Sequence, residues 1–412
     1  MIYFFYYLPL GLDVRGTRVP WASALLVCGA LAGFVTQLVQ PTWLWLYDTW
    51  FAYVPAAPQP SALFLNAYMH GDLLHLVSNL IALWVFGPAL EERLGAWRYL
   101  LLFHVANASA NLVQGATSLL LLPQLAEIGV VGASGAIAAL MGLALVRLHF
   151  ARVRIGYWAF LPLQAFTRAG AVHLSVPVAV LLWFLLQWAL VVIAWQGGNA
   201  QIAVGSHLGG LAFGVGIGLL AGLRAPAAAE SALQAGRRYA SAAQWYAAQG
   251  HLLDYVRSCP DDAEGRLELG RALRATQRDE AADEHYRAAC AAWARAGRWD
   301  RLEAAFCEAL RGNARFVLDA ALQMQMAQLY ERTLRLQAAE EAYVAYARHY
   351  PAQHAGALAL FRAARLARRR GAGDTARMRW VELVRHYPES CESDLARSEI
   401  QRLDARSEAR AA

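Results

Sequence analysis

Gly132-Ala133-Ser134-Gly135 opens one apolar stretch, and Gly205-Ser206-His207-Leu208-Gly209-Gly210 opens another further along the chain. A serine hydroxyl and an imidazole are costly to keep where the hydrocarbon of a bilayer should be. Small residues recur at helical spacing on each stretch: Ser134, Ala138 and Gly142 on the first, and Gly210, Gly214 and Gly218 on the second. Such stripes let membrane helices pack closely. We expect the two stripes to meet and to bring His207 toward Ser134.

Charge divides the chain into two parts. It has 412 residues and is 58% hydrophobic, yet residues 1–225 hold only 9 Arg and 6 acidic residues, against 28 and 25 in residues 226–412. We expect an all-α protein with a transmembrane domain at 1–225 and a soluble helical domain at 226–412. The net charge of +6 is spread among many acids and predicts no nucleic-acid partner. All 37 basic residues are Arg, which fits a GC-rich bacterial genome.

Six segments have about the length that a helix needs to cross a bilayer. They are residues 21–40, 73–90, 97–122, 134–150, 174–196 and 203–223. Arginines occur before the first segment and in every second connection after it, whereas the other connections have none. By the positive-inside rule both termini are predicted to be cytoplasmic, in a multi-pass protein of a bacterial membrane. The start of the sequence shows no removable signal peptide.

The second segment adds two hydrogen-bond donors. His75 and Asn79 are four residues apart and so share a helix face, from which both could donate to an oxyanion formed at Ser134. A metal site formed by His70, Asp72 and His75 is an alternative, but HExxH spacing and a third imidazole or thiolate are missing. The five cysteines also lack metal-ligand spacing, so we expect neither a metal nor a cofactor.

Each of these signals has a plainer interpretation when it is taken alone. A serine beside glycine in a membrane helix usually only packs or bonds to its own backbone. A single intramembrane histidine can be a proton relay or a ligand. Together with the matching stripes, Ser134 and His207 favour acyl transfer, in which a serine nucleophile is activated by a histidine base.

Several motifs in order resemble the rhomboid family of intramembrane serine proteases. They are residues 70–79, Gly87-Pro88-Ala89-Leu90-Glu91-Glu92-Arg93-Leu94-Gly95, Gly132-Ala133-Ser134-Gly135 with Ala139-Leu140-Met141-Gly142, and Ser206-His207-Leu208-Gly209-Gly210-Leu211-Ala212-Phe213-Gly214. The resemblance implies a six-helix core with a cavity open to the outer side. It implies that Ser134 is the nucleophile and His207 its base, with His75, Asn79 and the Ser134 N–H as oxyanion hole.

The resemblance implies further roles. Glu91 and Arg93 would hold the cytoplasmic turn, Gly132, Gly135, Gly210 and Gly214 would be structural, and residues 41–69 would form a first loop lying in the membrane. Substrates would be single-pass proteins whose transmembrane helix can unwind. The chain departs from the family at three positions: Ala138 stands where an aromatic often stacks on the histidine, Ser206 where alanine is common, and Asn66 where some members have histidine.

The soluble half carries an internal repeat. Arg348-His349-Tyr350-Pro351 recurs as Arg385-His386-Tyr387-Pro388, and Tyr343 and Trp380 each lie eight residues before the proline, with Ala339 and Ala376 twelve before it. A less regular unit contains Leu269, Gly270, Leu273, Ala282 and Tyr286. The pattern resembles tetratricopeptide repeats, which bind peptides or protein partners. A domain that only self-associates or stabilises the core is the alternative.

Two other functions fit parts of the sequence. A proteolytically silent rhomboid-like protein would bind membrane helices and deliver them to partners of the repeats. A small transporter is disfavoured because the chain shows neither an inverted repeat nor charged residues at the middle of its spans. The presence of both Ser134 and His207 favours the protease.

Overall fold

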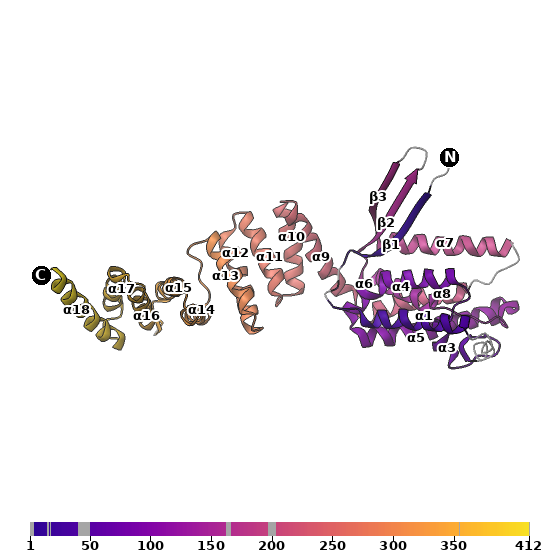
Figure 1. The fold of residues 1–412 in the computed structure, drawn as a ribbon, viewed down its shortest axis with the longest axis horizontal. Helices are drawn as coiled ribbons and strands as arrows, with labels where there is room; N and C mark the ends of the chain where they lie inside the picture. The colour runs from indigo at the N-terminus through magenta and orange to yellow at the C-terminus, as the bar shows by residue number, and fades with distance from the viewer. Residues whose placement is uncertain are drawn as a thin grey trace. The chain divides into compact units, whose positions relative to one another are not determined.

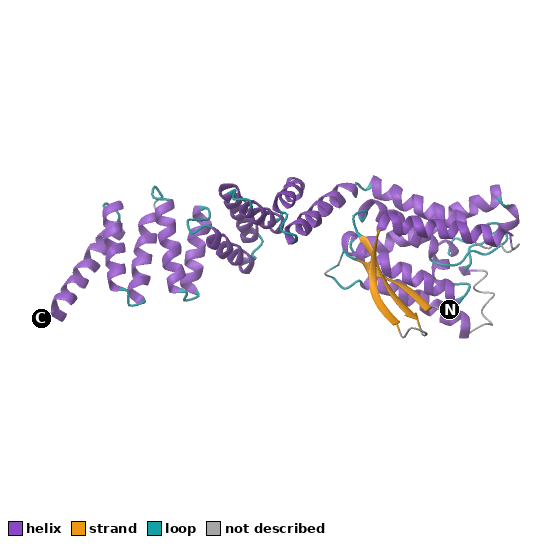
Figure 2. Cartoon of the chain, turned by 90° about the horizontal axis from the view of Figure 1, so that it is seen from above, coloured by secondary structure: helices purple, strands orange, loops and turns teal. Residues whose placement is uncertain are grey.

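The computed structural model describes residues 4–14, 16, 18–39, 50–161, 166–196, 203–353 and 355–411. The chain divides into two compact units, Met1–Ala228 and Ala229–Ala412 (Figures 1 and 2). Both are built mainly of helices, so the predicted fold class is confirmed. A three-stranded sheet in the first unit was not part of that prediction.

The first unit is a bundle of apolar helices. They are α1 (Trp21–Val39), α4 (Leu73–Leu94), α5 (Ala96–Leu121), α6 (Ser134–Arg147), α7 (Val176–Gln196) and α8 (Val204–Leu220), with short turns α3 (Ala62–Leu65), η3 (Asn66–Tyr68) and η4 (Pro123–Leu125). Each long helix covers one predicted segment. By length and composition, α1 and α4 qualify as membrane spans, or three spans if α8 and α9 (Arg224–Ser241) form one broken span. The number six stays a prediction.

Side chains at the two ends of α4 fix its place in the bundle. Asp72 precedes the helix, and its carboxylate accepts a hydrogen bond of 2.7 Å from the backbone N–H of His75. At the other end, Glu91 is buried and accepts bonds from Ala22 N, Ser23 N and Ser23 Oγ at 2.7–3.0 Å. These amides open α1 and have no partner within their own helix. Glu91 therefore ties α4 to α1, while Arg93 donates to the carbonyl of Ala89 on its own helix.

The sheet joins the start of the chain to the connection between α6 and α7. Strands β1 (Phe4–Leu12), β2 (Arg152–Leu161) and β3 (Phe166–Ser175) are antiparallel in the order β1-β2-β3, with Tyr7 opposite Tyr157 and Arg154 opposite His173 (Figure 1). In the predicted topology these residues are only connections. Val153, Ile155 and Tyr157 alternate with the period of a strand, a signal that the arginines between them concealed.

Helices α6 and α8 touch backbone to backbone. A Cβ atom added to Gly210 would overlap the carbonyl oxygen of Gly135, and one added to Gly214 would overlap that of Ala139. Gly142 of α6 faces Leu211 of α8 in the same way. Only glycine fits at such a distance. The glycine stripe of α8 therefore lies on α6, but it meets the backbone of Gly135 and Ala139, each one residue after a member of the predicted α6 stripe.

The second unit is a series of helices joined by tight turns. They are α9, α10 (Trp245–Ser258), α11 (Ala263–Ala275), α12 (Asp279–Arg295), α13 (Trp299–Gly312), α14 (Ala320–Arg332), α15 (Leu336–His349), α16 (Ala355–Arg369), α17 (Gly373–His386) and α18 (Cys391–Ala411). Five turns share one geometry, with positive φ at Ala243, Gln277, Gly297, Leu334 and Gly371. In each, the next residue's N–H bonds to the carbonyl five residues earlier, as at Gln244 and Tyr239. This is the Schellman motif.

A fixed side-chain pattern surrounds each of these turns. Seven residues before the turn residue lies a small buried one: Gly236, Gly270, Cys290, Ala327 or Ala364. Five and nine residues after it lie two more buried ones: Ala248 and Leu252, Ala282 and Tyr286, Leu302 and Phe306, Ala339 and Tyr343, Ala376 and Trp380. A Cβ on Gly270 would lie 3.1 Å from the Tyr286 ring, so the small residue makes room for the large one.

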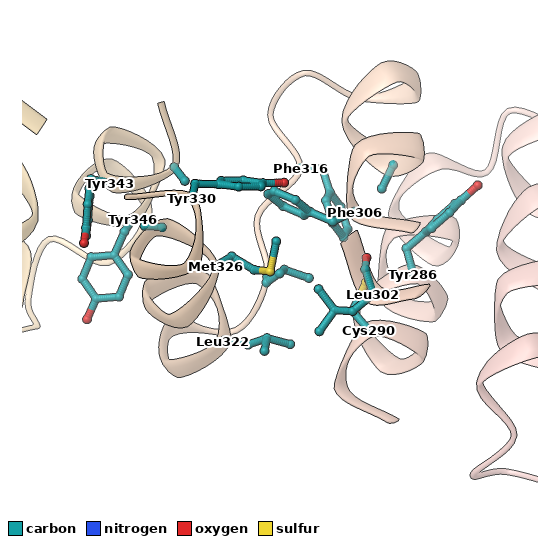
Figure 3. Packing of buried hydrophobic residues seen from close by; sticks show 14 of the residues in the cluster. Tyr286, Cys290, Leu302, Phe306, Phe316, Leu322, Met326, Tyr330, Tyr343 and Tyr346 are labelled. Carbon is teal, nitrogen blue, oxygen red and sulfur yellow. The ribbon is translucent and has the colours of Figure 1, made fainter. Parts of the chain in front are cut away.

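The irregular register of the repeat has a structural cause. The turns at Leu334 and Gly371 are separated like the repeated Arg-His-Tyr-Pro motifs, but those at Gln277 and Gly297 are much closer together. As a result α12 closes one pair of helices and opens the next. Phe316, between α13 and α14, fills the core there, with its ring 6.1 Å from Phe306 and 6.3 Å from Tyr286 (Figure 3).

Candidate active site

Ser134 is the first residue of α6 and is partly accessible. The turn before it depends on Gly132, whose φ of +111° is strained for any residue with a side chain. The backbone N–H of Gly132 donates to the carbonyl of Asn66 at 2.8 Å, which fixes the entry into the helix. The Ser134 hydroxyl therefore lies at a helix N-terminus, where free N–H groups and the positive end of the dipole favour negative charge.

His207 lies in the first turn of α8, and its Nε2 is 2.8 Å from Ser134 Oγ. The backbone contact between Gly135 and Gly210 brings the two helices together next to this pair. A serine and an imidazole at hydrogen-bond distance are the arrangement in which the ring can remove the hydroxyl proton.

His75 and Asn79 of α4 approach the same place from the other side of Gly132. A Cβ on Gly132 would lie 2.6 Å from the His75 ring and 3.5 Å from Asn79 Nδ2. Asn79 is 7% exposed, and its Nδ2 has no hydrogen-bond partner among the described residues. A buried donor without a partner costs free energy, so a site that leaves one facing the turn before Ser134 is suited to receive an acceptor.

The histidine ring has a second contact on its far side. Its Nδ1 is buried and has no hydrogen-bond partner in the described part of the chain. The ring of Trp183, from α7, lies 5.6 Å from that of His207 at an angle of 53°. Ala138, one turn after Ser134, is fully buried, and its methyl group faces Gly210. The aromatic neighbour of the imidazole thus comes from α7 rather than from α6.

A cluster of amides supports the turn before Ser134 and was not predicted. Asn107 and Asn111 of α5 donate to Asn66 Oδ1 at 2.7 and 3.0 Å, and Asn66 Nδ2 donates to Asn111 Oδ1 and to the Val130 carbonyl. All three side chains are buried. The spacing of four between Asn107 and Asn111 in an apolar helix was the available signal, because it places both amides on one face.

The alternative metal site is not assembled. Asp72 caps α4, and the rings of His70 and His75 touch edge to face with centroids 5.1 Å apart. Across the described residues, no group of three or more His, Cys, Asp or Glu side chains is placed to hold a metal ion.

The predicted first loop is described only from Trp50 onward; its residues 41–49 lie outside the described part of the chain. Tyr53 pairs with Val130 in an isolated antiparallel bridge, with backbone bonds of 2.9 and 3.0 Å. The phenol of Tyr53 also lies against Gly115 of α5. This part of the loop is therefore packed against the segment that leads to Ser134.

Part of the chain is similar to proteins of the rhomboid family. Residues 57–224 match the family model of the Rhomboid domain. Over 187 residues the chain is 29% identical to "Rhomboid protein 1, mitochondrial" of Saccharomyces cerevisiae, covering 44% of this chain and 46% of that protein. The chain thus spans about half the length of the curated relative it matches. The match to the Rhomboid domain model and the apolar helices indicate a membrane protein.

One solved structure is similar over a larger share of its own length. The alignment with the structure titled "Functional Characterization of Pseudomonas Aeruginosa pilF" covers 42% of the present chain and 99% of the chain in that structure. The sequence identity is 18% and the TM-score is 0.19.

Proposed function

From these findings we propose that the protein is an intramembrane serine endopeptidase that cleaves transmembrane segments with a Ser134–His207 dyad. The observation that carries the proposal is the 2.8 Å contact between His207 Nε2 and Ser134 Oγ at the start of α6. Both residues lie within the rhomboid domain match, at 57–224.

The chemistry is acyl transfer in two steps. His207 Nε2 takes the hydroxyl proton as Ser134 Oγ attacks the scissile carbonyl, and the resulting imidazolium gives that proton to the departing amine. In the second step a water molecule, deprotonated by His207, attacks the acyl ester and releases Ser134. No carboxylate takes part, because Nδ1 of His207 is unpartnered in the described residues.

The donors for the oxyanion come from two helices. The backbone N–H of Ser134 is among the free amides at the start of α6, and the amide of Asn79 and the ring of His75 lie beside Gly132. Donors that are fixed in advance and shielded from water stabilise the tetrahedral intermediate strongly. Asn79, already buried without a partner, loses no protein hydrogen bond when it binds the oxyanion.

The remaining parts of the proposal concern substrate and topology. Substrates are single-pass membrane proteins whose helix unwinds to present a peptide bond to Ser134. Both termini lie in the cytoplasm of a bacterial cell, in line with the arginine distribution. The second unit, with its repeated turns, is a tetratricopeptide-like array that binds a cytoplasmic protein or peptide.

The test compares two serines that lie near each other. In lipid nanodiscs, the full chain should cleave a reporter single-pass protein and be labelled by a fluorophosphonate probe, and Ser134→Ala should abolish both. Ser206→Ala is the matched control and should keep both activities, because Ser206 is a buried serine next to His207 in sequence but its hydroxyl lies against Gly135, whereas His207 Nε2 bonds to Ser134. Wild-type turnover by Ser134→Ala would refute the proposal.

The same experiment addresses the silent alternative. A wild-type chain that binds the reporter helix but neither cleaves it nor reacts with the probe is a membrane-helix adaptor. The second unit would then supply the contact with the partner protein.

A further inference from the structure

The dyad lacks the third group that usually orients a histidine base. In serine–histidine sites the base is held by a further side chain, so that its lone pair points at the hydroxyl. Here Nδ1 of His207 is buried and makes no hydrogen bond to any described residue. Packing against the ring faces must therefore supply the orientation that a hydrogen bond supplies elsewhere.

Trp183 is the aromatic side chain that packs on this ring. Its centroid lies 5.6 Å from that of His207, within the range of favourable aromatic pairs. On the α6 side the position one turn after Ser134 is Ala138, which has no ring to offer and whose methyl group would lie 3.3 Å from a Cβ on Gly210. The other two aromatic side chains that line the space beside His207, Phe184 and Trp188, pair with each other, with ring centroids 6.2 Å apart.

The surroundings of Trp183 leave the imidazole little other support. Helix α7 is buried at Val176 and Val180, but further along Leu182, Leu185 and Leu186 are about half exposed. Between α7 and α8 lies a hollow that is lined by Trp183, Phe184, Gln187, Trp188, Val204, His207 and Leu208. Without the indole, this hollow would open directly beside the ring and allow it to turn away from Ser134.

We propose that Trp183 is a positioning residue that holds the His207 ring in line with Ser134 Oγ in place of a hydrogen-bonded orienting group. This inference rests on the proposed function. It assigns to α7, a helix with no member in the dyad or among the oxyanion donors, control over the rotamer of the base.

The test distinguishes a role for the aromatic ring of Trp183 from a role for the volume of its side chain. In the full chain in lipid nanodiscs, Trp183→Leu and Trp183→Met should slow fluorophosphonate labelling of Ser134 and lower kcat for a reporter by about tenfold or more, because small misplacements of a catalytic group are costly. KM should change little, and Trp183→Phe should retain most of the rate. Trp188→Leu is the matched control, since Trp188 lines the same hollow but its ring pairs with Phe184.

The outcomes are distinct. Labelling of Trp183→Leu at the wild-type rate would overturn the inference alone. If that variant is unstable, Trp183→Met decides: labelling as fast as in Trp183→Phe would show that volume suffices and that the ring has no positioning role. A wild-type chain that is not labelled at all would instead overturn the proposed function.

Discussion

The helices of the two units pack by opposite means. Helices α6 and α8 approach through missing side chains, with Gly210 and Gly214 against the carbonyls of Gly135 and Ala139. In the second unit, helices meet through large side chains at fixed positions, such as Trp380 nine residues after its turn. One contact cannot tolerate an added methyl group, and the other cannot tolerate a lost ring.

Buried polar groups lie in different settings in the two units. In the second unit Tyr286 and Arg271 both bond to Glu308, and Tyr343 and Arg362 both bond to Glu331, although Tyr387 Oη and Trp380 Nε1 are buried there without partners among the described residues. Around Ser134, Asn79 Nδ2 and His207 Nδ1 are also unpartnered in the described chain, and both belong to the proposed catalytic group. Unsatisfied polar atoms in a native interior call for an explanation, and a catalytic site is one.

Removing the ring of Trp380 should have the largest effect on stability. Trp380→Ala leaves a cavity between α16 and α17, and such substitutions cost about 3–5 kcal/mol. Hydrogen exchange of the full chain should show faster exchange throughout the second unit and none of this change in α6 and α8. Trp299→Ala, at a partly exposed tryptophan of α13, is the control and should have a much smaller effect.

Adding one methyl group to the contact between α6 and α8 should have the second-largest effect on stability. In Gly214→Ala the new Cβ overlaps the Ala139 carbonyl, so α6 and α8 must separate, at about 1–3 kcal/mol. The Tm and the rate at which the probe labels Ser134 should both fall, because the same contact sets the distance between Ser134 and His207. In Gly216→Ala, on the same helix, the new Cβ meets open space, so both the Tm and the labelling rate should stay unchanged. An equal fall in Gly216→Ala would contradict the explanation, because α8 would then be sensitive to any substitution and not to its contact with α6.

Acid should loosen the second unit through its ion pairs. Arg271 hydrogen-bonds to Glu308 at 2.6–2.7 Å and holds the pKa of that carboxyl below its usual value. Because the pKa is lower in the folded than in the unfolded chain, the contact stabilises fully above the unfolded value, near pH 4.3, and is lost as pH falls through the folded one. Glu308→Gln should remove about 1 kcal/mol at pH 7.

The pH dependence provides the check on that assignment. The difference in free energy of unfolding between wild type and Glu308→Gln should shrink as the pH is lowered from 6 to below 4. A difference that stays constant over this range would mean that Glu308 acts through packing rather than charge. Arg257→Gln removes an exposed pair with Asp254 and is the control.

The smallest predicted effect is an increase in stability, from a substitution at the turn residue Leu334. Leu334 has a φ of +60° and is 66% exposed, so its side chain gives little packing in return for the strained turn. Leu334→Gly should stabilise the second unit by roughly 0.5–1 kcal/mol, since the relief of strain exceeds the added freedom of the unfolded chain. Gly371→Ala, at the equivalent turn, should destabilise it; a rise in Tm there would contradict the explanation.

The parts of the site that depend on residue spacing within a single helix were predictable from the sequence. The glycines after His207 indicated the face of α8 that meets α6, although on α6 the contact is centred on Gly135 and Ala139 rather than on Ser134 and Ala138. The structure places His207 Nε2 and Ser134 Oγ at hydrogen-bond distance. The spacing of His75 and Asn79 likewise placed them on one face of α4. The domain limits at 225 and 226, the catalytic roles and the six spans stay predictions.

Features formed by distant segments were not predictable. The contact of Trp183 with His207 depends on where α7 settles, and nothing in its uniformly apolar sequence distinguishes this indole from Trp188. Glu91 was expected to hold the cytoplasmic turn, and its bonds to the first amides of α1 could not be foreseen because that helix start lies 68–69 residues earlier in the sequence. In the sheet, β2 and β3 are neighbours in sequence, but β1 is too far from β2 for local periodicity to reveal their pairing.

That sheet has a consequence for biogenesis. Phe4 pairs with Phe160, so during translation β1 leaves the ribosome roughly 150 residues before its partner strand. At synthesis rates of about 5–20 residues per second, β1 waits about 10–30 seconds with both backbone edges open. Open edges invite wrong partners. After α1 to α6 are synthesised, β2 must therefore pair with β1, which was synthesised earlier. The sheet is complete only once the β2–β3 hairpin has formed.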